Sequence, residues 1–251
     1  MSWIPIKLPY FKESKFLPAP LPTTQEIEAS TAILGERSAQ KITAVGPYFV
    51  AKYGPGTSQI EGENLLFIER NIPTISVPRL YTIYRENNKL YIVMELIPGA
   101  TLQTLWPTLV ECEKMLIMNK LRSIFDQVRG LAPPAPGFYG SVAKGFIPHQ
   151  LFRTFKGIVS VSGPFDNEQD FNLGLAQQFG RIWDINKKYS SKTSFYQRHL
   201  SAVLCNHLPT FTHSDVQRKN IIVGNIDSNQ GTNGQKQMDY KVTVVDWEDA
   251  G

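Results

Sequence analysis

Residues 211–223 read FTHSDVQRKNIIV, and residues 240–251 read YKVTVVDWEDAG. The first stretch carries Asp215 and Asn220 within the pattern H-x-D-x-x-x-x-N, directly before a β-branched run. The second stretch carries Asp246 directly after another such run. β-Branched runs favour strands, so the two runs predict an antiparallel hairpin. Antiparallel pairing brings Asn220, at the entrance of this hairpin, close to Asp246 at its exit.

The polar residues around this hairpin suit phosphoryl transfer. The amide oxygen of Asn220 and the carboxylate of Asp246 are hard ligands of the kind that Mg²⁺ prefers. Asp215 precedes them and can accept a hydroxyl proton, and His213 completes the pattern of the protein-kinase catalytic loop. Such reactions depend on positioning and on charge neutralisation. The alternative is an ordinary hairpin in which these side chains cap polar turns.

A lysine and a glutamate upstream supply the parts that would hold nucleotide phosphates. Lys52 lies in the strand-like run FVAKYG and can grip the α- and β-phosphates if its side chain points inward. A buried ammonium needs a carboxylate partner, and Glu61 is the leading candidate, with Glu63 as the alternative. Taken alone, Lys52 fits a surface lysine of an edge strand equally well.

Two further stretches would complete a nucleotide site. Residues 92–99 read IVMELIPG, where the backbone of Glu95 and Ile97 can bond adenine with Met94 behind it. No glycine-rich phosphate loop precedes Lys52, and Ser38 with nearby backbone N–H groups is the candidate for covering the phosphates.

The chain changes character at Pro98 and Gly99. Before them, KITAVGPYFVAKYG predicts two strands joined by a tight turn, and IPTISVPRLYTIYRENNKLYIVMELIPG predicts strands around the turn RENNK. TTQEIEAS predicts the start of a helix, where Thr23 and Glu26 fit a capping box, and EGENLLFIERN predicts a short helix that Glu61 opens. After Pro98 and Gly99, three stretches have the apolar spacing of helices, and the third is SFYQRHLSAVLCNHL. The first two stripes are Ile117, Leu121, Ile124, Phe125 and Val128, then Phe171, Leu175, Phe179, Ile182 and Trp183. We therefore predict an α+β bilobal fold, with a strand-rich nucleotide-binding lobe over residues 1–97 and a larger helical lobe over residues 98–251. Residues 224–240, rich in Gly, Asn and Gln, are predicted to form an exposed loop.

Composition narrows the class of protein. The net charge of +4 is scattered, which favours a solvated surface over a nucleic-acid interface. No apolar run is long enough for a membrane span, and the first residues lack the core of a signal peptide. The two cysteines, Cys112 and Cys205, share no metal spacing and are predicted to be reduced core thiols of a cytoplasmic protein.

Taken together, these motifs resemble those of a known family. FVAKYG, EGENLLFIERNIPTISVPRLY, IVMELIPGATL, GFYGSV, SGPFDNEQDF and the opening pair of stretches are similar to the aminoglycoside phosphotransferase and choline kinase-like family. The likeness is strongest to its fungal-type branch, which is known simply as a phosphotransferase enzyme family. It implies a protein-kinase-like fold that is truncated at its C-terminal end, because relatives continue with further helices.

The resemblance also implies roles for individual residues. Asp215 would be the catalytic base, with His213 bracing its loop, and Asn220 and Asp246 would be the magnesium ligands. Lys52 and Glu61 would be the phosphate-gripping pair. The implied activity is ATP-dependent, magnesium-assisted transfer of the γ-phosphate to a hydroxyl of a small molecule. The alternative is a kinase-like protein, inactive or shortened, that binds nucleotide or a partner without catalysis.

Overall fold

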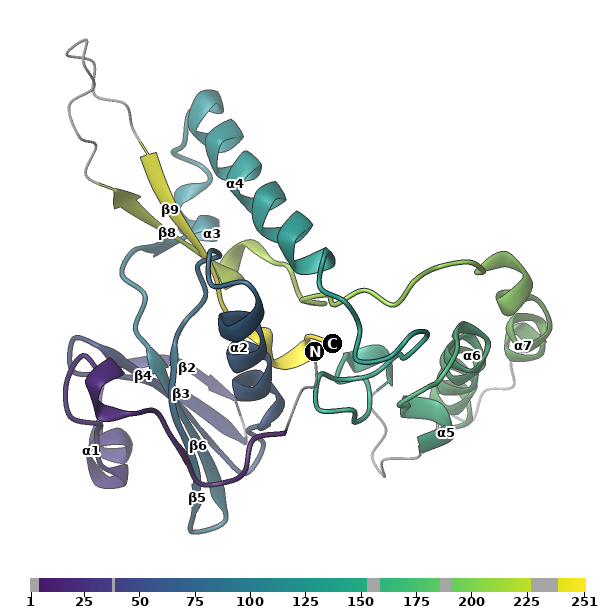
Figure 1. The fold of residues 1–251 in the computed structure, drawn as a ribbon, viewed down its shortest axis with the longest axis horizontal. Helices are drawn as coiled ribbons and strands as arrows, with labels where there is room; N and C mark the ends of the chain where they lie inside the picture. The colour runs from purple at the N-terminus through teal and green to yellow at the C-terminus, as the bar shows by residue number, and fades with distance from the viewer. Residues whose placement is uncertain (1–4, 38, 153–158, 186–190, 227–238) are drawn as a thin grey trace. The chain divides into compact units, whose positions relative to one another are not determined.

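The computed structural model describes residues 5–37, 39–152, 159–185, 191–226 and 239–251 (Figure 1). The chain forms two compact units. The first, called here the sheet unit, consists of Ile6–Val128 and Asp215–Trp247. The second, called the helical unit, consists mainly of Arg129–Ser214, together with Glu248–Gly251. The predicted boundary between residues 97 and 98 separates a nucleotide-binding lobe from a helical lobe. That division stays a prediction.

The sheet unit is built on a six-stranded antiparallel sheet in the order β1-β5-β6-β4-β3-β2. Its strands are β1 (Tyr10–Phe11), β2 (Ile33–Arg37), β3 (Gln40–Val45), β4 (Phe49–Gly54), β5 (Leu80–Glu86) and β6 (Lys89–Glu95). β5 and β6 are joined at Asn87 and Asn88, which both have positive φ, at 48° and 62°. Two successive positive φ angles match the twist of a tight hairpin, which explains the paired asparagines. The predicted strand pairs around residues 46–47 and 87–88 are confirmed.

A three-stranded sheet in the order β7-β8-β9 completes the strands of this unit. Its strands are β7 (Ala100–Thr101), β8 (Ile221–Ile226) and β9 (Asp239–Val244). Gly99, just before β7, has φ +136°, and a Cβ there would lie 2.5 Å from the carbonyl oxygen of Val223. A glycine is therefore required where the linker passes β8. The stretch 224–240 is not loop throughout, because its two ends belong to β8 and β9, and residues 227–238 lie outside the described residues.

The described residues of this unit also form the α-helices α1 (Thr24–Ala29), α2 (Ile60–Asn71), α3 (Leu102–Leu105) and α4 (Glu111–Arg129). The N-terminus of α1 is a capping box, in which the Thr23 hydroxyl accepts from the Glu26 N–H and the Glu26 carboxylate accepts from the Thr23 N–H at 2.8 Å. On α4, the predicted stripe faces the interior, with Phe125 half-buried and four members buried: Ile117, Leu121, Ile124 and Val128.

The two faces of the six-stranded sheet serve different purposes. Side chains alternate along a strand, so Ala51 and Tyr53 of β4 share one face, and Lys52 points to the other. The first face forms a core with α1: Ile27, Phe49, Ala51, Tyr53, Tyr81, Tyr91 and Val93. The second face approaches α2 at β5, and Figure 1 shows that helix beside the strands. The alternation therefore directs Lys52 toward the helix that carries Glu61.

The helical unit contains α5 (Val159–Ser162), α6 (Glu168–Ile185) and α7 (Ser191–Val203). The three long predicted helices of the chain are thus present, but the predicted apolar stripe on α6 is only partly correct. Phe171, Leu175 and Phe179 are half-buried, whereas Asn172 and Gln178 are buried. The side chains of the last two stripe residues, Ile182 and Trp183, lie outside the described residues. No residue of α7 is buried.

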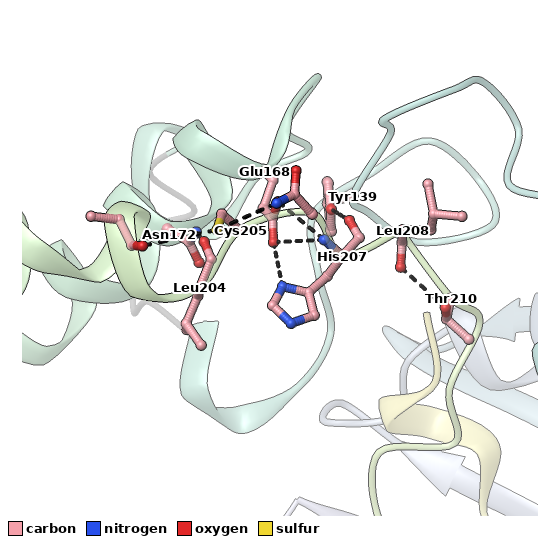
Figure 2. Close-up of polar contacts among 10 residues, drawn as sticks. Tyr139, Glu168, Asn172, Leu204, Cys205, His207, Leu208 and Thr210 are labelled. Atoms are coloured by element: carbon pink, nitrogen blue, oxygen red, sulfur yellow. Dashed lines mark hydrogen bonds and ion pairs between the residues drawn. The ribbon is translucent and has the colours of Figure 1, made fainter.

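The segment after α7 is held by polar contacts, shown in Figure 2. The Asn172 side chain donates to the carbonyl oxygen of Leu204 at 2.8 Å, which gives this buried amide its partner. Nδ1 of His207 lies 2.7 Å from the Glu168 carboxylate, and the Tyr139 hydroxyl donates to the carbonyl oxygen of His207 at 2.6 Å. These contacts fix the chain that leads into the His213 motif.

Cys112 and Cys205 are both exposed, so the prediction of core thiols is wrong. Cys112 follows the first residue of α4 and Cys205 follows α7, so each lies at a helix end rather than on an apolar stripe.

Among the helices that the structure describes, none combines the length and the apolar composition that a membrane span requires.

Candidate functional site

The candidate site begins at Lys52, in the middle of the sheet. β4 lies between β3 and β6, where Lys52 pairs with Ile42 on one side and with Ile92 on the other. The side chain is on the face opposite the α1 core, and Lys52 is only 2% exposed. The alternative of a surface lysine on an edge strand is therefore wrong.

The Lys52 ammonium lies between two carboxylates. Its Nζ is 2.9 Å from Oε2 of Glu61 and 2.8 Å from Oδ1 of Asp246. A buried ammonium is costly without partners, and here a helix and the end of a hairpin each supply one. One ammonium and two carboxylates have a formal charge of −1, which a bound cation would offset.

Glu61 and Glu63 have different surroundings, although both are buried near the start of α2. Glu61 forms the expected ion pair with Lys52. Glu63 accepts instead from the side chain of Gln59 at 2.9 Å and from the backbone N–H of Ile6. Burial raises the pKa of the Glu63 carboxyl, and the hydrogen bonds from Gln59 and Ile6 oppose this shift. The carboxylate that contacts Lys52 is therefore Glu61, as the sequence favoured.

The hairpin of β8 and β9 brings the two predicted metal ligands to one end. Ile221 pairs with Val244, and the N–H of Val245 donates to the carbonyl oxygen of Asn220 at 2.9 Å. Asn220 therefore lies just before the first strand and Asp246 just after the second, at the same end of the hairpin, as antiparallel pairing predicts.

Hydrogen bonds orient Asp215 and Asn220 against each other. Nδ2 of Asn220 donates to the backbone oxygen and to Oδ2 of Asp215, both at 3.0 Å. The side chain of Gln217 donates to the other carboxylate oxygen of Asp215. Both bonds from Asn220 use its nitrogen, so they leave its amide oxygen as the atom for a cation. Gln217 was not predicted as a site residue, because an exposed glutamine in a turn carries no signal in sequence.

Asp246 is held in a sparsely populated backbone conformation. Its φ is +65°, a region that non-glycine residues seldom adopt. The next residue, Trp247, is fully buried and donates from Nε1 to the carbonyl oxygen of Val244 at 2.9 Å. The side chain of Asn64 on α2 donates to the carbonyl oxygen of Trp247 at 2.8 Å. This anchoring offsets the cost of the conformation at Asp246.

The predicted adenine-binding residues lie at the end of β6. Met94 and Ile97 are buried, and Glu95 is half-buried. The N–H of Glu95 donates to the carbonyl oxygen of Arg79 at 2.9 Å. Glu95 can therefore offer its carbonyl oxygen to a base, but not this N–H.

Ser38 and His213 complete the predicted site residues. Ser38 lies outside the described residues. His213 is 1% exposed and belongs to the helical unit, whereas Asp215 begins the second stretch of the sheet unit. The roles that the sequence suggests for both residues stay predictions.

The donor set of the site suits magnesium. An amide oxygen from Asn220 and a carboxylate from Asp246 are hard oxygen ligands, and the excess negative charge beside Lys52 favours a divalent cation. The residues present therefore fit the ion that the sequence motif implies.

Comparison with known proteins supports the fold. No protein-family model matches the chain. No curated protein matches it. Among solved structures, the streptomycin–ATP complex of APH(2")-IIa is similar with a TM-score of 0.53 and 15% identity, over 87% of this chain and 65% of that one. Aminoglycoside phosphotransferase APH(4)-Ia is similar with a TM-score of 0.54 and 16% identity, over 90% and 69%. A complex of a thermostable APH(4)-Ia mutant with ADP and hygromycin B is similar over 87% and 66%, again with a TM-score of 0.54.

These likenesses show that the chain has the aminoglycoside phosphotransferase version of the protein-kinase-like fold, as the sequence predicts. The chain spans about two thirds of the length of these solved structures.

Proposed function

We propose that this chain transfers the γ-phosphoryl group of ATP to a hydroxyl of a small molecule, with Mg²⁺. The observation that carries the proposal is the buried Lys52 ammonium between Glu61 and Asp246, in a chain with the fold of ATP-binding phosphotransferases. An ammonium that is buried with two carboxylates has no evident use in stabilising a sheet. It is the arrangement expected of a site that holds a charged, metal-bound ligand.

Each residue has a chemical task in this proposal. Lys52 binds the α- and β-phosphates, and Glu61 holds the lysine in place. The acceptor oxygen forms a bond to the γ-phosphorus while the bond from that phosphorus to the bridging oxygen of ADP breaks. Asp215 accepts the proton that the acceptor hydroxyl loses. The hydrogen bonds from Asn220 and Gln217 keep the Asp215 carboxylate in one orientation.

Asn220 and Asp246 would hold the magnesium ion, which when bound neutralises charge on the phosphates. Adenine would contact the carbonyl oxygen of Glu95 and the backbone of Ile97, with Met94 behind the base. We further propose that His213 braces the catalytic loop and that Ser38 covers the phosphates.

The acceptor is proposed to be a small hydroxyl-bearing compound of the cytoplasm. Aminoglycosides are polycations and favour acidic clefts. The densest acidic runs of the sequence are DNEQD at residues 166–170 and DWED at residues 246–249, and neither is a long acidic stretch. A neutral or singly charged alcohol therefore fits better, with neither nucleic acid nor a membrane as a partner.

A second candidate is a kinase-like protein that binds nucleotide without transferring phosphate. The observation in its favour is the low identity of 15% and 16% to the solved phosphotransferases, a level at which proteins share a fold without necessarily sharing turnover. The two candidates share the nucleotide site and differ in turnover.

The test is a thermal-shift measurement with ATP, in Mg²⁺ and in EDTA, followed by a phosphate-transfer assay. At a hundredfold excess of ligand over Kd, binding adds about 2.7 kcal/mol, or a rise in Tm of roughly 5–10 °C. Asp246→Asn should remove the magnesium-dependent part of this rise. Asp126→Asn, at an exposed position on α4, is the matched control and should keep it.

The result decides between the candidates. A magnesium-dependent shift together with phosphate transfer to a member of a panel of alcohols, amino alcohols and sugars supports the enzyme. The same shift with no transfer supports the binding protein. An equal shift in wild type and Asp246→Asn would remove Asp246 from the site.

A further inference from the structure

The residues Ile6–Lys12, called here the N-terminal arm, bend at Leu8 and Pro9 and then form β1 at Tyr10–Phe11. Half-buried and exposed positions alternate strictly along them, with Ile6, Leu8, Tyr10 and Lys12 on the half-buried side. This alternation is typical of a strand with one face against the protein.

The second half of the arm is bound to the sheet. Tyr10 pairs with Ile83, and the hydroxyl of Thr82 donates to the carbonyl oxygen of Tyr10 at 2.7 Å. The N–H of Lys12 donates to the carbonyl oxygen of Tyr81 at 2.8 Å. The arm therefore extends the sheet at the edge strand β5.

The same arm is also bound to α2 near both ends of that helix. Near the first end, Gln59 donates to the carbonyl oxygen of Ile6 at 3.0 Å, and Glu63 accepts from the N–H of Ile6. Near the second end, Nζ of Lys12 lies 2.5 and 2.8 Å from the two carboxylate oxygens of Glu69. Gln59 and Glu69 are separated by about 15 Å of helix, and the arm contacts α2 at both ends of this span. The arm thus ties α2 to the edge of the sheet along most of its length.

The burial of α2 reflects this enclosure. All residues from Glu61 to Ile68 are buried, whereas a surface helix leaves one face in water. Gly62 packs against Ile83 on the sheet side, and Asn64 bonds the backbone of Trp247. The arm covers Glu63, a carboxyl that would otherwise be expected in solvent.

We infer that the N-terminal arm positions α2, so that Glu61 is held at Lys52, with Lys12, Gln59 and Glu63 as positioning residues. The inference rests on the proposed function and deepens it. It makes the phosphate-gripping pair depend on the arm, which lies 40 to 46 residues before Lys52 in the sequence. Release of the arm would loosen α2, separate Glu61 from Lys52 and weaken nucleotide binding.

The test begins with Lys12→Ala, which removes the attachment to Glu69. The matched control is Lys15→Ala, which breaks the exposed 2.7 Å pair between Lys15 and Glu13, outside the arm. Hydrogen exchange of the backbone amides in α2 reports on the helix directly, whether or not a nucleotide binds. In Lys12→Ala we expect exchange over Glu61–Ile68 to become about fivefold faster, the scale of one partly buried ion pair. The control should exchange as wild type does.

A double-mutant cycle shows whether the arm acts through Glu61. In the otherwise native chain, Lys12→Ala should raise the Kd for magnesium-ATP about fivefold. In a Glu61→Gln background, the same change should leave that Kd unaltered, because the pair that the arm supports is already broken. Charge reversal at both positions, Lys12→Glu with Glu69→Lys, should restore the exchange rate of α2.

The outcomes separate the two claims. Unchanged exchange in α2 would overturn the role of the arm, whatever the nucleotide data show. If Lys12→Ala also raises the Kd for magnesium-ATP fivefold in the Glu61→Gln background, the arm does not act through Glu61. If wild type binds no magnesium-ATP, the proposed function fails, and the exchange data alone decide on the arm. Should Lys12→Ala not fold, Lys12→Gln keeps most of the side chain and gives the same comparison.

Discussion

Gly62→Ala is the change that most directly tests how α2 is placed. A Cβ at residue 62 would lie 2.2 Å from Cδ1 and 3.2 Å from Cγ1 of Ile83, which is fully buried in β5. Ordinary contact begins at 3.4 Å, so Cδ1 or the helix must move by 3.4 − 2.2 = 1.2 Å. Because Gly62 adjoins Glu61, a lifted helix would also carry the carboxylate away from Lys52.

The expected free-energy change is a difference of two effects. Overpacking of a filled core costs about 1–3 kcal/mol, whereas replacing glycine by alanine inside a helix gains about 1 kcal/mol. We therefore expect a net loss of about 1 kcal/mol, which lowers Tm by roughly 2–4 °C in a chain of this size. The Kd for magnesium-ATP should rise as well.

The assay is thermal or urea unfolding of Gly62→Ala, Ile83→Val and the double variant. Ile83→Val removes Cδ1 and alone costs about 0.5–1.5 kcal/mol. In the double variant the alanine should no longer destabilise, giving a favourable coupling of about 1–2 kcal/mol. A Gly62→Ala protein that is more stable than wild type would refute the close approach. Additive effects would place the strain at some other contact.

Three further changes test separate parts of the molecule. Asp215→Asn should cut turnover about a hundredfold or more while leaving the Kd for ATP nearly unchanged in a binding titration, because a general base acts only in the transition state; equal turnover would contradict its role. Glu63→Gln should remove a pH dependence of the free energy of unfolding, because burial raises the folded-state pKa of this carboxyl above its ordinary 4.5. In urea titrations, wild type should lose stability relative to the variant as pH rises from 4.5 through the folded-state pKa. Parallel pH profiles of the two proteins would argue against this effect. Thr43→Val should raise the free energy of unfolding by about 1 kcal/mol, because the buried Thr43 hydroxyl has no hydrogen-bond partner among the described residues. A lower free energy of unfolding would mean that a water or another group does bond this hydroxyl.

The sequence was sufficient for the parts of the site that follow local rules. Two β-branched runs predicted a hairpin, and antiparallel pairing then required Asn220 and Asp246 to meet. The cost of a buried ammonium predicted a carboxylate partner for an inward-pointing Lys52. The capping box at Thr23 and the turn at residues 87–88 were also readable, because each depends on neighbouring residues alone.

Features that depend on distant contacts were not readable. β1 is two residues long and pairs with a strand about 70 residues away, so it has no periodicity of its own. α2 is buried on all sides over two turns, which removes the amphipathic pattern that marks a surface helix. On α6, Asn172 is buried because its side-chain amide bonds the carbonyl oxygen of Leu204. A hydrophobicity scale would have placed this residue on the surface.

The position of the helical unit within the sequence has an evolutionary consequence. Lys52, Glu61, Asn220 and Asp246 all belong to the sheet unit, yet residues 129–214 of the helical unit are encoded between them. For the sheet unit those residues are an insertion, and they can diverge or be exchanged while the residues around Lys52 are kept. Under the proposed function, chimeric chains that trade residues 129–214 with a related sequence test whether these residues govern the choice of acceptor.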